Sequence, residues 1–126
     1  MTRLALLVAI ATAAGCASSE PKPLPTATTP EASREALVNT LDAWKGGAAR
    51  DQLTDRSLPV YLQDDDFARG RKLAGYQIEG EPKPVGTGLT YIVNLTFAEG
   101  QSATRRIAYR VVTDPNISIT REDRIP

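Results

Sequence analysis

Residues 89–97 read LTYIVNLTF, and large apolar side chains alternate there with mostly polar ones. Because successive side chains of an extended chain point to opposite sides, the apolar ones share one face. They are Leu89, Tyr91, Val93, Leu95 and Phe97. A period of two sustained over this length predicts a half-buried β-strand. The apolar face requires a second layer, so this segment predicts a sheet that another element covers.

Further strands are predicted on either side of this segment. Tyr76 and Ile78 mark a strand before it, and a loop with two prolines and two glycines is expected at 82–88. Residues 107–111 alternate in the same way, and residues 117–120 follow a turn at 114–116. Consecutive strands joined by short turns predict a four-stranded antiparallel meander.

The covering layer is predicted to be a helix near the start of the domain. Thr29 is an N-cap candidate, and Pro30 suits the first helical position. Three large apolar side chains follow at helical spacing: Leu37, Leu41 and Trp44. Two glycines at 46–47 end the helix. A helical turn at 48–54, an extended segment at 58–62 and a turn or helical turn at 64–69 are expected before the first strand. The expected fold class is α+β, with an N-terminal helix packed on the meander.

The first sixteen residues have the pattern of an export signal. Arg3 precedes an apolar run, and the small residues 13–15 (AAG) stand directly before Cys16. This stretch resembles the signal peptides of bacterial lipoproteins. The resemblance implies cleavage after Gly15, a diacylglycerol on the sulfur of Cys16 and acylation of the new amino terminus. The alternatives are a secretory signal with an incidental cysteine and a membrane anchor, although about 11 apolar residues fall short of the roughly 20 that span a bilayer.

The chain divides into three parts on this interpretation. Residues 1–15 are the signal peptide, residues 16–30 are the lipidated cysteine and a tether rich in Pro, Ser and Thr, and residues 31–126 are one small domain. Cys16 is the only cysteine, so no internal disulfide forms. Ala17 and Ser18 follow it without the Asp that retains lipoproteins at the inner membrane. By resemblance, the protein is expected at the outer membrane, facing the periplasm.

Composition narrows the classes of function. Fifteen basic residues balance fifteen acidic ones, which argues against nucleic acid as a partner and against electrostatic attachment to lipid. The absence of histidine removes the Ser-His-Asp arrangement and the usual zinc sites, so neither an enzyme, a metal nor a cofactor is expected. The run Asp64-Asp65-Asp66 lacks the spacing of a calcium loop. It is interpreted as a solvated turn in which Asp66 caps a short helix.

Two groups of residues are candidate sites. Arg106 and Arg110 share one strand face, where they either meet an anionic partner or solvate the sheet and pair with Glu79 or Glu99. Four aromatic residues either line a pocket between helix and sheet or belong to the core. They are Trp44, Tyr76, Tyr91 and Tyr109.

Element order gives a second resemblance. A helix followed by an antiparallel sheet is similar in outline to cystatin-like and NTF2-like domains, and residues 41–46 (LDAWKG) before a strand pair rich in Arg and Tyr resemble small bacterial lipoproteins. These folds host many functions, so no activity transfers. The favoured hypothesis is a non-catalytic interaction module that binds an envelope protein. The alternative is a small-ligand-binding or catalytic NTF2-like domain with an aromatic pocket, and a homodimer is compatible with either.

Overall fold

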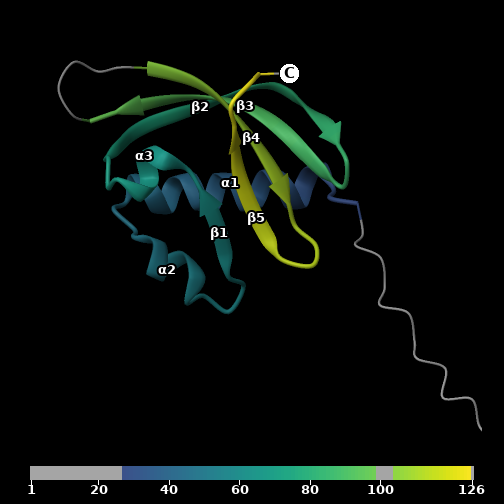
Figure 1. The fold of residues 1–126 in the computed structure, drawn as a ribbon, viewed down its shortest axis with the longest axis horizontal. Coiled ribbons are helices and arrows are strands. Elements are labelled where there is room, and N and C mark those ends of the chain that lie inside the picture. Colours follow the sequence, from purple (N-terminus) through teal and green to yellow (C-terminus); the bar gives the residue numbers. More distant parts are fainter. Residues whose placement is uncertain (1–26, 99–103, 126) are drawn as a thin grey trace, which may run out of the picture.

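One long helix lies beneath a curved sheet in this computed structural model, which describes residues 27–98 and 104–125 (Figure 1). Helix α1, Pro30–Lys45, begins as predicted, because the side chain of Thr29 accepts a hydrogen bond from the amide of Ala32 at 3.2 Å. It ends where Gly47 adopts a φ of 90°, a left-handed conformation that glycine tolerates best. The predicted α+β class and covering helix are therefore confirmed.

The sheet has five strands in the order β1-β5-β4-β3-β2. Their bounds are β1 Val60–Gln63, β2 Leu73–Val85, β3 Gly88–Phe97, β4 Thr104–Val112 and β5 Ile117–Glu122. Strands β2 to β5 pair antiparallel with their neighbours, as the meander requires. Strand β1 pairs parallel with β5, Val60 opposite Ile117. The prediction of a purely antiparallel four-stranded sheet was therefore incomplete, because the extended segment near 58–62 adds a fifth, parallel strand.

The loop expected at 82–88 is largely strand. Strand β2 runs through Pro82 and Pro84 to Val85, with an irregularity in its register between Glu79 and Lys83. β2 lies at one end of the strand order, so its outer side has no neighbour in the sheet. Proline is tolerated there because the ladder does not require its missing amide hydrogen. Two prolines also protect this edge from pairing with another chain.

Two short helices lie in the connections: α2, Arg50–Thr54, between α1 and β1, and α3, Asp65–Ala68, between β1 and β2. Helix α2 corresponds to the helical turn expected at 48–54 and places Leu53 in the core, and helix α3 places Phe67 there. The core lies between α1 and the concave face of the sheet, where Leu37, Leu41 and the alternate residues of β3 are buried. Within residues 27–98 and 104–125, no helix is long and apolar enough to cross a membrane. Cys16 and most of the expected tether lie outside the described residues.

Candidate functional site

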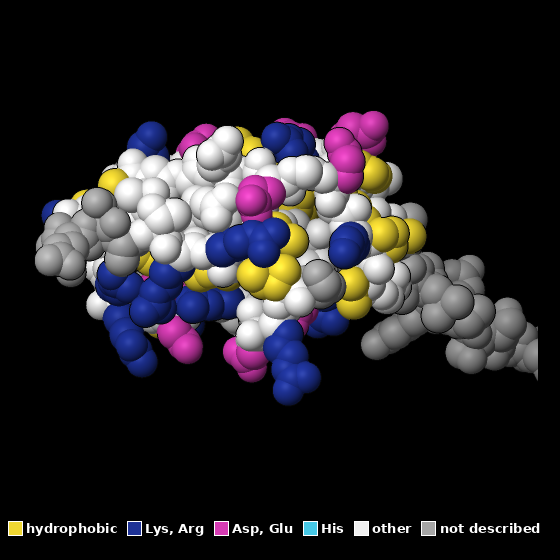
Figure 2. Space-filling view, turned by 90° about the horizontal axis from the view of Figure 1, so that it is seen from above, with side chains coloured by type: hydrophobic (Ala, Val, Ile, Leu, Met, Phe, Trp, Pro, Cys, Tyr) yellow, Lys and Arg dark blue, Asp and Glu magenta, His cyan; other side chains and the backbone are white. Residues whose placement is uncertain are grey.

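Among the described segments, no element covers the outer face of the sheet (Figure 1). Both candidate arginines lie on this face, because they alternate along β4 with the buried side chains of Ile107 and Tyr109. Arg106 and Arg110 stand two positions before and after Ala108 on β4, and Ile92 of β3 lies opposite Ala108. Both arginine side chains are about half exposed, whereas Ala108 has no exposed surface. Figure 2 views the sheet from above and shows basic, acidic and apolar side chains interspersed on this face.

Each of these arginines has a carboxylate partner on another strand: Glu122 is on the adjacent β5, whereas Glu79 is on β2, across β3. Nε of Arg106 lies 2.6 Å from Glu79, and Nε of Arg110 lies 3.4 Å from Glu122. The hydrogen bond from Arg106 holds the pKa of Glu79 below its ordinary value. The predicted pairing with Glu79 is confirmed, while Glu99 lies outside the described residues. The two arginines are thus fixed in place, and the face around them is nearly neutral.

The four candidate aromatic residues do not surround one cavity. The hydroxyl of Tyr91 shares a 2.5 Å hydrogen bond with Ser33 in the first turn of α1, whereas Trp44 lies in its last turn. At 1.5 Å per residue these helix positions are about 16 Å apart along the axis. The indole Nε1 of Trp44 donates to the carbonyl oxygen of Arg71 at 2.8 Å.

The other two tyrosines also have separate partners. Tyr76 donates to Asp42 on the exposed side of α1 at 2.7 Å, and burial together with this bond raises the pKa of Tyr76 to about 12. Tyr109 is fully buried and donates to Asp64. The structure therefore places Trp44, Tyr91 and Tyr109 within the core and Tyr76 at its edge.

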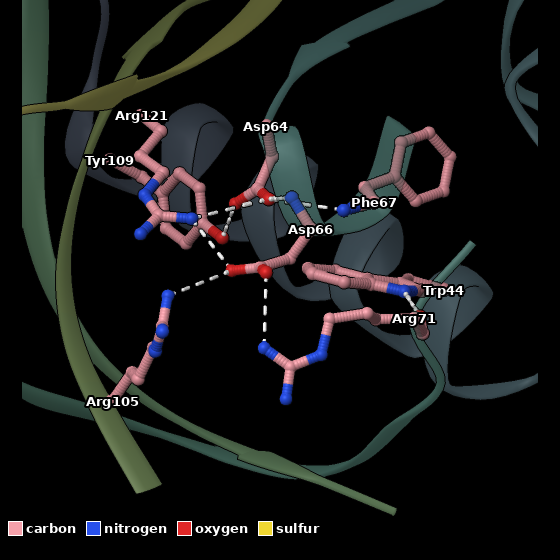
Figure 3. Close-up of polar contacts among 8 residues, drawn as sticks. All are labelled: Trp44, Asp64, Asp66, Phe67, Arg71, Arg105, Tyr109 and Arg121. Carbon is pink, nitrogen blue, oxygen red and sulfur yellow. Dashed lines mark hydrogen bonds and ion pairs between the residues drawn. The ribbon is translucent and has the colours of Figure 1, made fainter. Parts of the chain in front are cut away.

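A cluster of two buried carboxylates and three partly exposed arginines joins α3 to β4, to β5 and to the segment that follows α3 (Figure 3). We define it as the carboxylate–arginine cluster: Asp64, Asp66, Arg71, Arg105, Tyr109 and Arg121. Oδ2 of Asp66 lies 2.7 Å from Arg121 and 3.7 Å from Arg105, and its Oδ1 lies 3.1 Å from Arg71. Asp66 is only 3% exposed, but the side chains of Arg71 and Arg121 are each 26% exposed and that of Arg105 is 52% exposed, so water screens these ion pairs in part.

The arginines determine the charge of Asp66. Burial alone would raise its pKa, but the hydrogen bonds from Arg121 and Arg71 and the charge of Arg105 outweigh burial and hold the pKa of Asp66 below its ordinary value. For Tyr109, burial first and then the adjacent Asp64 raise the pKa. The phenol therefore stays protonated and serves as a donor to Asp64.

The interpretation of the acidic run as a solvated turn was wrong. Asp64, and not Asp66, caps the short helix, since its Oδ1 accepts hydrogen bonds from the amides of Asp66 and Phe67 at 2.7 and 3.1 Å. Asp64 and Asp66 are buried, and only Asp65 is exposed. Each buried carboxylate has hydrogen-bond partners, which is what makes its burial tolerable.

The strand pattern contained a signal for this cluster. Arg105 falls two positions before Ile107, and Arg121 two positions after Ile119, so both share the inward face of their strands. A cationic side chain on an apolar face needs an internal partner, and the adjacent carboxylates of the chain are the natural candidates. The prediction from the sequence placed Arg106 and Arg110 on the outward face and did not assign Arg105 and Arg121 to the inward one.

The contacts within the cluster support a structural role. Three guanidinium groups occupy the oxygens of Asp66, and Tyr109 and two backbone amides occupy those of Asp64. Among residues 27–98 and 104–125, no group of three or more acidic, histidine or cysteine side chains is placed to hold a metal ion. The cluster therefore fixes α3 against β4 and β5.

Comparison with known proteins gives no match for this chain, either among family models, among curated proteins or among solved structures.

Proposed function

We propose that this protein is a lipid-anchored, non-catalytic interaction module of a bacterial cell envelope. Its docking surface is the outer sheet face, which we define by its accessible residues Ile92, Arg106 and Arg110. The observation that supports the proposal is that this face is uncovered in the described residues, yet its arginines are held in fixed positions by Glu79 and Glu122. Arginines fixed in this way lose little conformational freedom when a partner binds.

The charge of this face indicates the chemistry of the partner. Since Glu79 and Glu122 already neutralise Arg106 and Arg110, the surface offers no net charge to a polyanion. It offers guanidinium donors beside the partly exposed apolar side chain of Ile92. A protein surface that combines carbonyl or carboxylate acceptors with a small apolar centre matches this arrangement.

The sequence supports an anchored position for the module. The stretch that resembles a lipoprotein signal ends at Cys16, and a proline-rich segment follows it. The described chain enters the fold at Thr28, whose amide donates to Thr87 at 2.9 Å and whose hydroxyl oxygen accepts from the amide of Thr113 at 3.2 Å. The described chain therefore enters the domain beside the β2–β3 turn.

The test is partner capture from native envelopes after chemical crosslinking, with the lipidated full-length protein as bait. We expect one envelope protein near unit stoichiometry, and its loss in the double variant Arg106→Glu, Arg110→Glu. Because these changes place like charges beside Glu79 and Glu122, a thermal melt must show that the variant is folded, and Arg106→Ala with Arg110→Ala provides a milder form.

The matched control is Arg34→Glu with Arg56→Glu, which makes the same change of charge on exposed residues away from this face. Capture that is unaffected by the double variant, or equally reduced by the control, would contradict the proposal. The mass of the N-terminal peptide of the unaltered protein shows whether acyl chains are attached. Cys16→Ala is the unanchored control.

A further inference from the structure

A hollow of about 430 Å³ lies on the helix side of the sheet, between the end of α1, α3 and the start of β2. Its floor is aromatic: Trp44 and Phe67 are both buried and pack edge to face with ring centroids 5.5 Å apart. A volume of this size falls within the range of small-molecule sites. Only 3% of Trp44 and 7% of Phe67 is exposed, so the floor presents ring edges and not open ring faces to a ring-sized group.

The backbone carbonyl groups around this hollow are largely engaged. The oxygen of Trp44 accepts from the amide of Gly47, and that of Phe67 accepts from Gly70, in each case at 2.9 or 3.0 Å. The oxygen of Arg71 accepts from the indole of Trp44, and that of Lys72 accepts from Ala98. The lining therefore has few free acceptors to offer to a ligand that donates hydrogen bonds.

The charged side chains around the hollow are all basic. Arg50, Arg71 and Lys72 line it, and no acidic side chain does. Arg71 is already committed, since it pairs with Asp66 and lies over the ring of Phe97 at 3.9 Å. Arg50 and Lys72 form no ion pair within the described segments, so their donors remain available.

We propose that this hollow binds a small organic anion with an apolar, ring-sized body. The ring lies against the aromatic floor of Trp44 and Phe67, and the anionic group accepts hydrogen bonds from Arg50 and Lys72. The excess of free donors over free acceptors favours a carboxylate over a neutral or cationic analogue. This site is separate from the outer sheet face, so either proposal can fail without the other.

Trp44 is the only tryptophan in the chain, so its fluorescence reports on this site alone. The lipidated full-length protein in detergent is titrated with phenylacetate and, in parallel, with phenethylamine, which has the same ring but the opposite charge. We expect a saturable change in Trp44 emission with phenylacetate, and binding of phenethylamine at least about tenfold weaker.

The variant Arg50→Gln with Lys72→Gln should weaken phenylacetate binding by about tenfold or more, since each hydrogen bond to a charged group is lost. Arg34→Gln with Lys83→Gln removes the same charge from exposed positions outside the hollow and should leave binding unchanged. No saturable change up to about 10 mM phenylacetate, equal binding of both probes, or full binding by the Arg50, Lys72 variant would overturn the proposal.

Discussion

The phenol of Tyr109, in the middle of β4, donates a hydrogen bond to the carboxylate of Asp64, which caps helix α3. Both residues are buried. One bond thus joins the centre of the sheet to the start of a four-residue helix that is too short to be stable by itself. The position of α3, and with it Phe67 and Asp66, depends on this contact.

Replacement of Tyr109 by Phe should therefore destabilise the protein by about 1–3 kcal/mol, because a buried carboxylate oxygen loses its donor. Urea unfolding measures this free energy. Tyr61→Phe is the control, since Tyr61 is 47% exposed and its loss of a hydroxyl should have almost no effect. Equal effects of the two variants would show that the bond to Asp64 contributes nothing.

Within the acidic run, replacement of Asp64 should reduce the unfolding free energy much more than replacement of Asp65. Asp64→Ala removes the cap of α3, for about 0.5–2 kcal/mol, and also leaves the hydroxyl of Tyr109 unpaired, for about 1–3 kcal/mol. Asp65→Ala changes an exposed residue and should alter the unfolding free energy by less than about 0.5 kcal/mol. A ranking with Asp65 as the more sensitive position would contradict the observed capping.

Low pH should reduce the free energy of unfolding, because Asp66 becomes protonated and loses its ion pairs. Its pKa in the folded state lies below the ordinary value of 3.8, so the stability that it contributes is complete above about pH 4 and is lost as the pH falls through the folded pKa. Asp66→Asn should reduce the unfolding free energy at pH 7 and should reduce it by less at pH 3, which lies below the ordinary pKa of 3.8. The loss at pH 7 should be smaller than the about 3–5 kcal/mol of a fully buried pair, because Arg71 and Arg121 are each 26% exposed.

The control for this pH dependence is Asp65→Asn, which changes the neighbouring exposed carboxylate. The unfolding free energies of the unaltered protein and of Asp66→Asn are compared at pH 3 and at pH 7. If they differ by the same amount at both pH values, the ion pairs of Asp66 do not contribute to the pH dependence of stability.

Backbone packing gives a fourth prediction. A Cβ atom at Gly88 would lie 2.9 Å from the carbonyl oxygen of Val111 and 2.9 Å from Cγ2 of Val112, so Gly88→Ala should destabilise the protein by about 1–3 kcal/mol. Gly75→Ala is the matched change, since a Cβ there meets nothing within 4 Å. Thermal unfolding of both variants tests the difference, and similar melting temperatures would contradict the close approach at Gly88.

The elements with strong local signals could be predicted from the sequence. Thr29 and Pro30 mark the start of α1, and the alternation over 89–97 corresponds to β3, Gly88–Phe97. The parallel pairing of β1 could not be predicted, because a four-residue strand has little pattern of its own and its partner, β5, is distant in sequence. The strand through Pro82 was missed because proline is a loop signal wherever the position of the edge is unknown.

Among the candidate sites, local pattern also predicted one and missed those that depend on tertiary packing. Alternation along β4 placed Arg106 and Arg110 together on the outer face, and their register shows this directly. The carboxylate–arginine cluster was not predicted, because a run of acids is usually solvated and its burial depends on Arg71, Arg105 and Arg121 arriving from three separate segments. The hollow beside Trp44 depends equally on tertiary packing, which local sequence does not encode.

The central claim is that the outer sheet face binds an envelope protein. Site-specific photocrosslinking in living cells tests it most directly, with a photoreactive amino acid placed at Asn94, which lies opposite Arg106 on that face, or at Asn39, which is exposed on α1. The account predicts one dominant protein adduct from position 94 and none from position 39. No adduct from position 94, or the same adduct from both positions, would contradict it.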